Sequence, residues 1–102
     1  MIYVKLHESE NGALLAMCDE KLIDRVLEEG NVYINIRDYS EFYKGELIGV
    51  GELRGRLPEK LHSANVVGNE AVEAAVKHSI VKRENVKTVS GIRYAHAYRI
   101  ED

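Results

Sequence analysis

The sequence predicts an α+β fold with a mostly antiparallel sheet, because a strand hairpin lies near each end of the chain and helical segments lie between them. Alternating apolar and polar residues indicate the strands, and the period changes to that of a helix in between. These patterns do not follow the regular βαβ alternation of a doubly wound nucleotide-binding fold. We expect the order ββα β (α)α ββ, with the helices packed on the sheet.

The first unit is predicted to be a hairpin followed by a helix. Residues 2–7 alternate between apolar and polar, residues 13–17 are apolar, and Asn11-Gly12 between them suits a tight turn because both residues tolerate positive φ. Asp19 is expected to cap a helix that Gly30 ends. The apolar face of this helix consists of Leu22, Ile23, Val26 and Leu27.

The middle of the chain carries a third strand and weaker helical signals. Residues 32–36 alternate as a strand does, whereas glycines interrupt residues 38–56, so we expect a loop and then a poor helix over residues 49–57. Pro58 favours a short helical turn through Leu61. A better helix is expected from about residue 69 to residues 78–80. Its inward residues are Ala71, Val72, Ala75 and Val76.

The second hairpin is predicted at the end of the sequence, where Ser90-Gly91 separates residues 86–89 from residues 92–100. Alternation along the last strand assigns its side chains to two faces. One face carries Ile92, Tyr94, His96, Tyr98 and Ile100, and the other carries Arg93, Ala95, Ala97 and Arg99.

Size and composition indicate a single domain over residues 1–102. Hydrophobic residues make up 45% and charged residues 30% of the chain, which is ordinary for a globular protein. The uncharged runs are too short to span a bilayer, and a single cysteine allows no internal disulfide, so we expect a cytoplasmic protein that does not bind membranes. The net charge of −3 argues against avid nonspecific DNA binding.

Five segments in order carry a resemblance to a known family. They are Tyr3-Val4-Lys5, Cys18-Asp19-Glu20, Phe42-Tyr43-Lys44-Gly45-Glu46, residues 65–72 (Asn-Val-Val-Gly-Asn-Glu-Ala-Val) and residues 91–96 (Gly-Ile-Arg-Tyr-Ala-His). The chain resembles an archaeal family known as domain of unknown function number 424, from Tyr3 to Arg99. This resemblance implies an archaeal, cytosolic protein and implies no activity. The sequence departs from the family at Gly49, Gly51 and Gly55, where a more continuous helix is expected.

The turn from Asn65 to Asn69 is one candidate ligand site. Gly68 directly precedes a predicted helix, so the free amide groups of that helix could bind an anion such as phosphate, with Asn65 and Asn69 adding polar contacts. The commoner interpretation of such a turn is that Gly68 makes the turn and Asn69 caps the helix. The segment is neither a Walker loop nor a Rossmann fingerprint.

Cys18 and Asp19 form a second candidate, because a helix N-terminus lowers the pKa of a nearby thiol and favours a nucleophile. With Asn11-Gly12 as the turn centre, His7 would lie opposite Ala16 and about one diagonal step from Cys18. These positions would allow Cys18, His7 and Asp19 to form a Cys–His–Asp cluster. The simpler interpretation is a buried cysteine beside an N-cap aspartate.

The four histidines do not have the spacing of a metal motif, and no cofactor cradle is recognisable, so neither a metal nor a cofactor is predicted. His96, between Tyr94 and Tyr98, is interpreted as a core or interface residue. The remaining three histidines are interpreted as surface residues.

Partner contacts are predicted at two places. Arg93, Arg99 and Lys87 form a basic strip that could contact RNA, although alternation puts the tyrosines of the last strand on the opposite face from its arginines. Tyr43 belongs to an aromatic loop with Tyr39 and Phe42, which would anchor a partner or cover the edge of the core.

These observations favour a non-catalytic binding module with an RNA or protein partner, associated with translation or RNA metabolism. The alternative is a small-ligand or phosphate-binding protein, or a small enzyme, that uses the Asn65–Asn69 turn with Cys18, Asp19 and His7. The sequence leans away from an enzyme because it offers no convincing catalytic pair.

Overall fold

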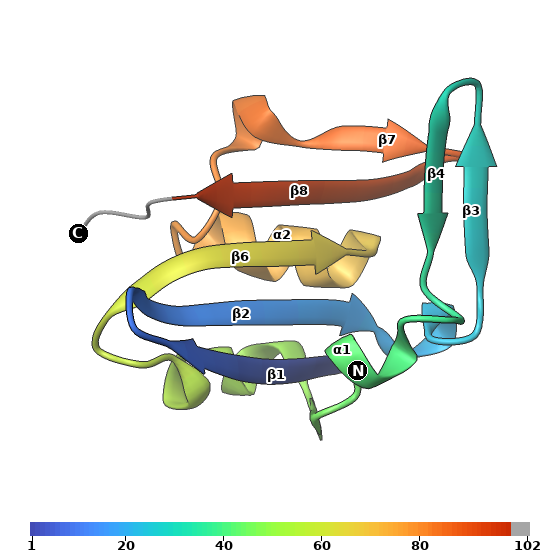
Figure 1. The fold of residues 1–102 in the computed structure, drawn as a ribbon. Helices are drawn as coiled ribbons and strands as arrows, with labels where there is room; N and C mark the ends of the chain where they lie inside the picture. Colours follow the sequence, from blue (N-terminus) through green and yellow to red (C-terminus); the bar gives the residue numbers. More distant parts are fainter. Residues whose placement is uncertain (99–102) are drawn as a thin grey trace.

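The computed structural model describes residues 1–98 and contains a six-stranded sheet with the order β5-β1-β2-β6-β8-β7 (Figure 1). Neighbouring strands are antiparallel except for β2 and β6, which are parallel. The strands are β1 (Ile2–Ser9), β2 (Gly12–Asp19), β5 (Glu46–Ile48), β6 (Leu61–Val67), β7 (Lys87–Val89) and β8 (Ile92–Tyr98). The predicted α+β class with a mostly antiparallel sheet is confirmed.

A separate two-stranded sheet and several short helices complete the described part of the chain. The antiparallel hairpin consists of β3 (Val26–Glu29) and β4 (Val32–Asn35). The α-helices are α1 (Ser40–Tyr43) and α2 (Asn69–Lys77), and the 3-10 helices are η1 (Glu20–Leu22), η2 (Val50–Arg56) and η3 (Arg83–Asn85). Within residues 1–98, no helix is long and apolar enough to cross a membrane.

The helix α2 forms where the sequence predicts it. Ala71, Val72 and Ala75 recur at helical spacing and are fully buried. The weak helix expected over residues 49–57 is the 3-10 helix η2, which buries Leu53 and packs near α2. Glycines at three positions in and beside η2 explain why no regular α-helix forms there.

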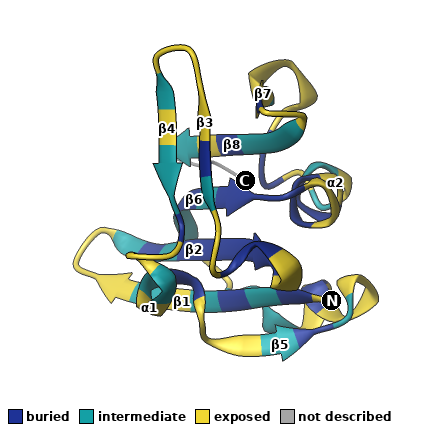
Figure 2. Ribbon diagram, turned by 90° about the vertical axis from the view of Figure 1, so that its right-hand side faces the viewer, coloured by how far each residue is buried: buried dark blue, intermediate teal, exposed yellow. Residues whose placement is uncertain are grey.

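The large sheet is covered on its two sides by different elements (Figure 2). The helix α2 packs on one side with an aliphatic core that includes Leu15, Met17 and Val66. The β3–β4 hairpin lies on the other side, together with α1, over a core that includes Cys18, Leu27 and Tyr43. We call this second side the aromatic side, because Tyr3, Phe42, Tyr43 and Tyr94 pack there.

The helix predicted from Asp19 to Gly30 is wrong. Only η1 forms there, and Val26 to Glu29 instead pairs with Val32 to Asn35. Gly30 has a φ of +58° and makes the two-residue turn of this hairpin with Asn31. Gly-Asn directly before an alternating strand is a hairpin signal, so the helical spacing of Leu22, Ile23, Val26 and Leu27 was misleading.

The helical turn predicted from Pro58 to Leu61 is also wrong, and most of the turn expected between it and α2 is part of a strand. Residues 61–67 form β6, a central strand between β2 and β8. Ala64 and Val66 lie in the α2-side core, and Val67 lies in the core on the aromatic side. Polar residues at positions 62, 63 and 65 hid the alternation of this strand from a sequence pattern.

Both predicted hairpins of the large sheet are present, and the first has a different register. Ser9 pairs with Gly12, so the turn is centred on Glu10 and Asn11 and not on Asn11 and Gly12. His7 therefore lies opposite Leu14, not opposite Ala16 as predicted. This shift moves every cross-strand pair inferred from the turn.

Candidate functional site

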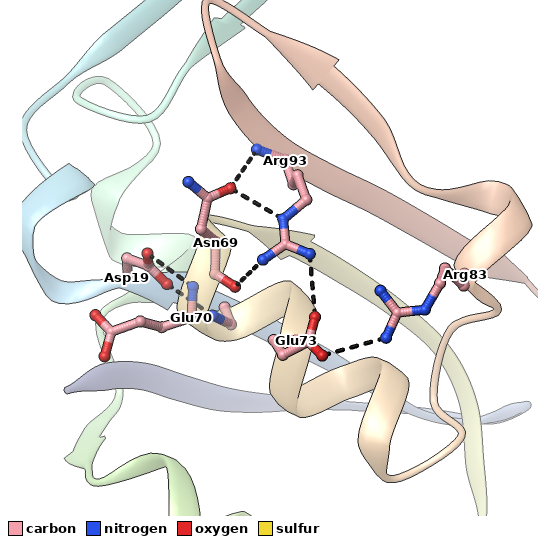
Figure 3. Close-up of polar contacts among 7 residues, drawn as sticks. Asp19, Asn69, Glu70, Glu73, Arg83 and Arg93 are labelled. Atoms are coloured by element: carbon pink, nitrogen blue, oxygen red, sulfur yellow. Dashed lines mark hydrogen bonds and ion pairs between the residues drawn. The ribbon is translucent and has the colours of Figure 1, made fainter.

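The predicted phosphate turn is filled by a carboxylate of the protein itself. Asp19 accepts hydrogen bonds from the backbone amides of Ala71 (2.7 Å, Oδ1) and Glu70 (3.2 Å, Oδ2) at the start of α2, as Figure 3 shows. Its side chain is 1% exposed. Burial raises the pKa of Asp19, and the two amide hydrogen bonds act in the opposite direction. Because Asp19 already satisfies these amides, it caps α2 and leaves no anion site there.

Asn69 and Arg93 are bound to each other. The backbone amide and Nε of Arg93 both donate to Asn69 Oδ1, at 2.9 and 3.2 Å, and Nη2 donates to the Asn69 carbonyl at 3.1 Å (Figure 3). Nη1 of Arg93 pairs with Glu73 at 3.0 Å, and Arg83 pairs with the same carboxylate. Hydrogen bonds from these two arginines lower the pKa of Glu73. Arg93 thus joins β8 to α2, while Arg99 lies outside the described residues.

Cys18 and His7 do not form a catalytic cluster. Cys18 is fully buried, and burial, with a smaller effect of the Asp19 charge, raises the pKa of its thiol to about 12. His7 instead stacks on Phe42, with ring centroids 4.6 Å apart, and donates from Nε2 to the Phe42 carbonyl at 2.8 Å. The two side chains therefore serve packing and the attachment of α1 to β1.

Two candidates that the sequence assigned to different sites are brought together. The hydroxyl of Tyr43, at the end of α1, donates to Oδ1 of Asn65 on β6 at 3.1 Å. Tyr43 is 5% exposed, and burial raises the pKa of its hydroxyl, which therefore stays protonated. The hydrogen bond fixes the aromatic loop against the middle of the sheet.

All aromatic residues of the chain lie on one side of the large sheet. The sequence has six tyrosines, one phenylalanine and no tryptophan. Tyr3 and Tyr94 belong to the core on the aromatic side, and Tyr98 extends the same face of β8. The other four line a hollow of about 350 Å³ between the β3–β4 hairpin, α1 and the sheet. Its walls include Tyr33, Tyr39, Phe42, Tyr43, Asn65 and His96.

His96 lines both this hollow and a second depression along β8. It lies directly opposite Asn65 in the strand register, and its ring makes edge contacts with Tyr94 and Tyr98, at centroid distances of 6.1 and 6.4 Å. The second depression, of about 320 Å³, continues from His96 past these tyrosines to Lys87. Burial, followed by the nearby charge of Lys87, lowers the pKa of His96. The imidazole is therefore neutral at physiological pH.

The exposed rings of this surface are its most accessible large apolar groups. The exposed fractions of Tyr98, Tyr39 and Tyr33 are 74%, 66% and 59%. Sequence reasoning identified Tyr39, Phe42 and Tyr43 as a loop and placed Tyr94 and Tyr98 on one face, but missed Tyr33 and the pairing of Tyr43 with Asn65. The alternation of residues 32–35 was the sequence signal that puts Tyr33 on the exposed face of its strand. No group of three or more His, Cys, Asp and Glu side chains among residues 1–98 is arranged to hold a metal ion.

Comparison with known proteins places the chain in a family. Residues 7–100 match the family described as protein of unknown function (DUF424). The chain belongs to this family. A crystal structure of an uncharacterized conserved protein from Methanopyrus kandleri has a similar fold, with a TM-score of 0.77 and 18% sequence identity over 99% of this chain and 93% of that one. No match was found among curated proteins.

Proposed function

We propose that this DUF424 protein is a non-catalytic binding module that holds single-stranded RNA on its aromatic side, in translation or RNA metabolism. The observation that carries the proposal is the segregation of all aromatic side chains to one side of the sheet, around a hollow and its continuation along β8. A core that needed aromatic rings only for packing would have no reason to leave Tyr33, Tyr39 and Tyr98 exposed.

The chemistry of this surface suits bases better than phosphates. Every nucleobase presents a flat π-face that stacks on tyrosine, and each such stack contributes about 1–3 kcal/mol. Asn65 and neutral His96 offer hydrogen bonds to the edges of a base. Lys87 is the exposed cation beside His96 and Tyr98. We therefore expect RNA binding that depends on stacking and depends weakly on salt concentration.

Arg93, one member of the predicted basic strip, is not part of the proposed surface. Arg93 lies on the opposite side of β8, where Asn69 and Glu73 occupy its guanidinium. The catalytic alternative also loses support, because its nucleophile candidate, Cys18, is buried and protonated. Binding without catalysis is thus the simpler use of the aromatic side.

The test is the fluorescence anisotropy of a labelled single-stranded RNA of about ten nucleotides, a length within the range of such sites. Tyr98→Ala is expected to weaken binding roughly 5- to 100-fold, because one stacking ring is lost. Tyr98→Phe keeps the ring and is expected to bind as the unaltered protein does. Raising the salt from about 50 to about 200 mM is expected to change the affinity by less than about tenfold, since only one cation lies at the site.

Val50→Ala is the matched control. Val50 is an exposed apolar residue on η2, on the α2 side of the sheet, so its truncation is expected to leave RNA binding unchanged. The proposal fails if the unaltered protein leaves the RNA free at about 50 mM salt, or if Tyr98→Ala binds as tightly as Tyr98→Phe. Capture of a protein through the aromatic side, without RNA binding, would also overturn it in favour of a protein partner.

A further inference from the structure

A groove of about 610 Å³ runs between η2 and α2, on the side of the sheet opposite the aromatic side (Figure 2). Every third or fourth residue of α2 from Glu70 to Lys77 lines one wall, so the groove follows this helix for about two turns. Val50, Gly51 and Arg54 of η2 form the other wall. The volume lies within the range of sites that bind a ligand or a side chain of a partner.

Small and apolar residues line both walls of this groove. Ala74 of α2 is buried, and Gly51 of η2 has no side chain. A Cβ at Gly51 would meet no atom within 4 Å, so the space in front of this glycine is open. Val50 beside it is an exposed apolar residue. The groove therefore suits an apolar side chain better than a strongly hydrated group.

The two carboxylates of the groove are already paired with cations. Glu73 binds Arg83 at 3.2 Å and Arg93 at 3.0 Å, as Figure 3 shows. Glu70 lies 3.6 Å from the amino group of Met1. The negative charge on the α2 wall is thus balanced within the protein, and a partner does not have to supply cations there.

The two cations of the groove, in contrast, have no such partners. Among residues 1–98, neither Arg54 nor Lys77 takes part in an ion pair, and both side chains are exposed. Arg56, two positions after Arg54, is instead held by Glu46 and lies near Glu52. The groove therefore carries an excess of positive charge, although the whole protein has a net charge of −3. Its charge complements that of an anionic partner.

An acidic peptide matches this groove better than the backbone of a nucleic acid does. Phosphates are charged and hydrated at every step of a nucleic-acid chain, so they would leave Val50 and the open space at Gly51 uncovered. An amphipathic helix with acidic residues beside its apolar face offers both kinds of contact at once, and a groove between two helices is a common place for such a helix to dock.

We propose that the groove between η2 and α2 docks an acidic amphipathic helix of a partner protein. The apolar face of this helix packs on Val50, Gly51 and Ala74, and its carboxylates pair with Arg54 and Lys77. The inference goes beyond RNA binding and is independent of it, because the groove and the aromatic side lie on opposite sides of the sheet.

The test uses two labelled synthetic peptides of about twelve residues, long enough to span the groove as a helix. Both carry leucines at helical spacing, and the remaining positions are mainly glutamate in one peptide and lysine in the other. By fluorescence anisotropy at about 50 mM salt, the acidic peptide is expected to bind at least about tenfold more tightly than the basic one. The difference is expected to shrink at about 500 mM salt, because the charges are exposed and screened.

Gly51→Leu is designed to fill the groove without disturbing the fold. A side chain at this position meets open space, and it is expected to weaken binding of the acidic peptide at least about tenfold, since it displaces one apolar anchor. Gly55→Leu is the matched control in the same 3-10 helix. A Cβ there also meets no atom within 4 Å, but Gly55 does not line the groove, so binding is expected to stay within about threefold.

Charge reversal tests the electrostatic part of the proposal. Arg54→Glu combined with Lys77→Glu is expected to reverse the preference, so that the basic peptide binds more tightly. The control combines Arg25→Glu with Lys44→Glu, two exposed cations outside the groove, and changes the net charge by the same amount. This control is expected to keep the preference for the acidic peptide.

Several outcomes would overturn the inference. These are a free acidic peptide at about 1 mM protein, equal binding by the Gly51→Leu and Gly55→Leu variants, and a preference that both charge reversals change alike. Weaker RNA binding by Gly51→Leu would assign the groove to RNA instead. A dimer in solution that Gly51→Leu converts to a monomer would assign it to a second copy of the chain. Absence of RNA binding in the unaltered protein would overturn only the proposed function, because the peptide measurements do not depend on it.

Discussion

The carboxylate of Asp19 accepts a hydrogen bond from the backbone amide of Ala71 at 2.7 Å, across 52 positions in the sequence. The relationship follows from the one parallel strand pair of the sheet. Cys18 pairs with Val67, so β2 and β6 end side by side, and the residues that follow this pair, Asp19 and Gly68, lie next to each other. Gly68 then opens α2, whose first amides point at Asp19.

Asp19→Asn is predicted to destabilise the protein by about 1–2 kcal/mol, the usual cost of losing a helix cap. The amide has one acceptor oxygen where the carboxylate has two, so one of the amides of Glu70 and Ala71 loses its partner in a buried site. Urea unfolding followed by circular dichroism measures the change as a shift of the midpoint with an unchanged slope.

Asp24→Asn is the control for this substitution. Asp24 is exposed and forms no hydrogen bond among the described residues, so its replacement is expected to change stability by less than about 0.5 kcal/mol. Equal stabilities of the two variants would contradict the capping role of Asp19.

Gly68→Ala is predicted to destabilise the protein more than the loss of the cap does. Gly68 has a φ of +116°, which an alanine adopts only with strain of about 1–3 kcal/mol, and a Cβ at this position would collide with the side chain of Asp19. The backbone strain and the loss of the Asp19 cap both destabilise the folded state. Thermal unfolding is expected to show a midpoint well below that of Asp19→Asn.

Gly55→Ala tests whether this effect is specific. A Cβ at Gly55 would have no atom within 4 Å, and its φ lies outside the range that disfavours side chains. The substitution is expected to be neutral or to stabilise by about 0.4–1 kcal/mol, because alanine restricts the unfolded chain. If Gly55→Ala were as damaging as Gly68→Ala, the collision with Asp19 would not explain the loss.

The sequence was sufficient to predict those elements whose signal is local. The two hairpins of the large sheet and α2 follow from alternation, turn residues and helical spacing within about ten residues. The strand β4 was predicted, but its partner β3 was missed, because Leu22, Ile23, Val26 and Leu27 fit a helix equally well and Gly30 also suits the end of a helix. The strand β6 was missed because its polar residues obscure the alternation of a strand. It is buried because it lies between β2 and β8, which the sequence pattern does not reveal.

The sequence identified several residues of the candidate site but not which of them lie in contact. Asp19 was recognised as a cap, but the helix that it caps begins about 50 residues later, which only the parallel pairing of β2 and β6 reveals. Tyr43 and Asn65 were likewise assigned to different hypothetical sites, and they meet through contacts between distant segments. Alternation correctly separated Tyr94 and Tyr98 from Arg93, since that relation lies within one strand.

Cys18 is predicted to be unreactive in the native protein. Its side chain is fully buried and its pKa is about 12, so at about pH 8 the thiol is both protonated and inaccessible. A chromogenic disulfide reagent is expected to react at least about 100-fold more slowly than with the unfolded protein, because labelling requires an opening of the core. The same sample in denaturant, which should release one equivalent, is the control. Rapid labelling of the native protein would show a thiolate at the surface and revive the catalytic alternative.

His96 is predicted to titrate below the ordinary histidine pKa of about 6.5. Burial disfavours the imidazolium, and the ammonium of Lys87 on β7 adds to this effect, whereas the other groups around the ring are Asn65 on β6, the two tyrosines of β8 and Glu84 on η3. NMR titration of the imidazole protons measures the midpoint directly. Lys87→Met is expected to raise the midpoint only partly, because burial is the larger cause and remains.

The same shift gives a pH dependence of stability with a definite sign. A histidine whose pKa is lower in the folded state binds its proton more readily when unfolded, so stability is complete above about pH 6.5 and falls as the pH decreases below this value. His96→Gln removes this group and is expected to flatten the decrease between about pH 6.5 and pH 5. A decrease of stability with the same steepness in the variant would show that other groups cause it. A titration midpoint above 6.5 would show that folding raises, rather than lowers, the pKa of His96.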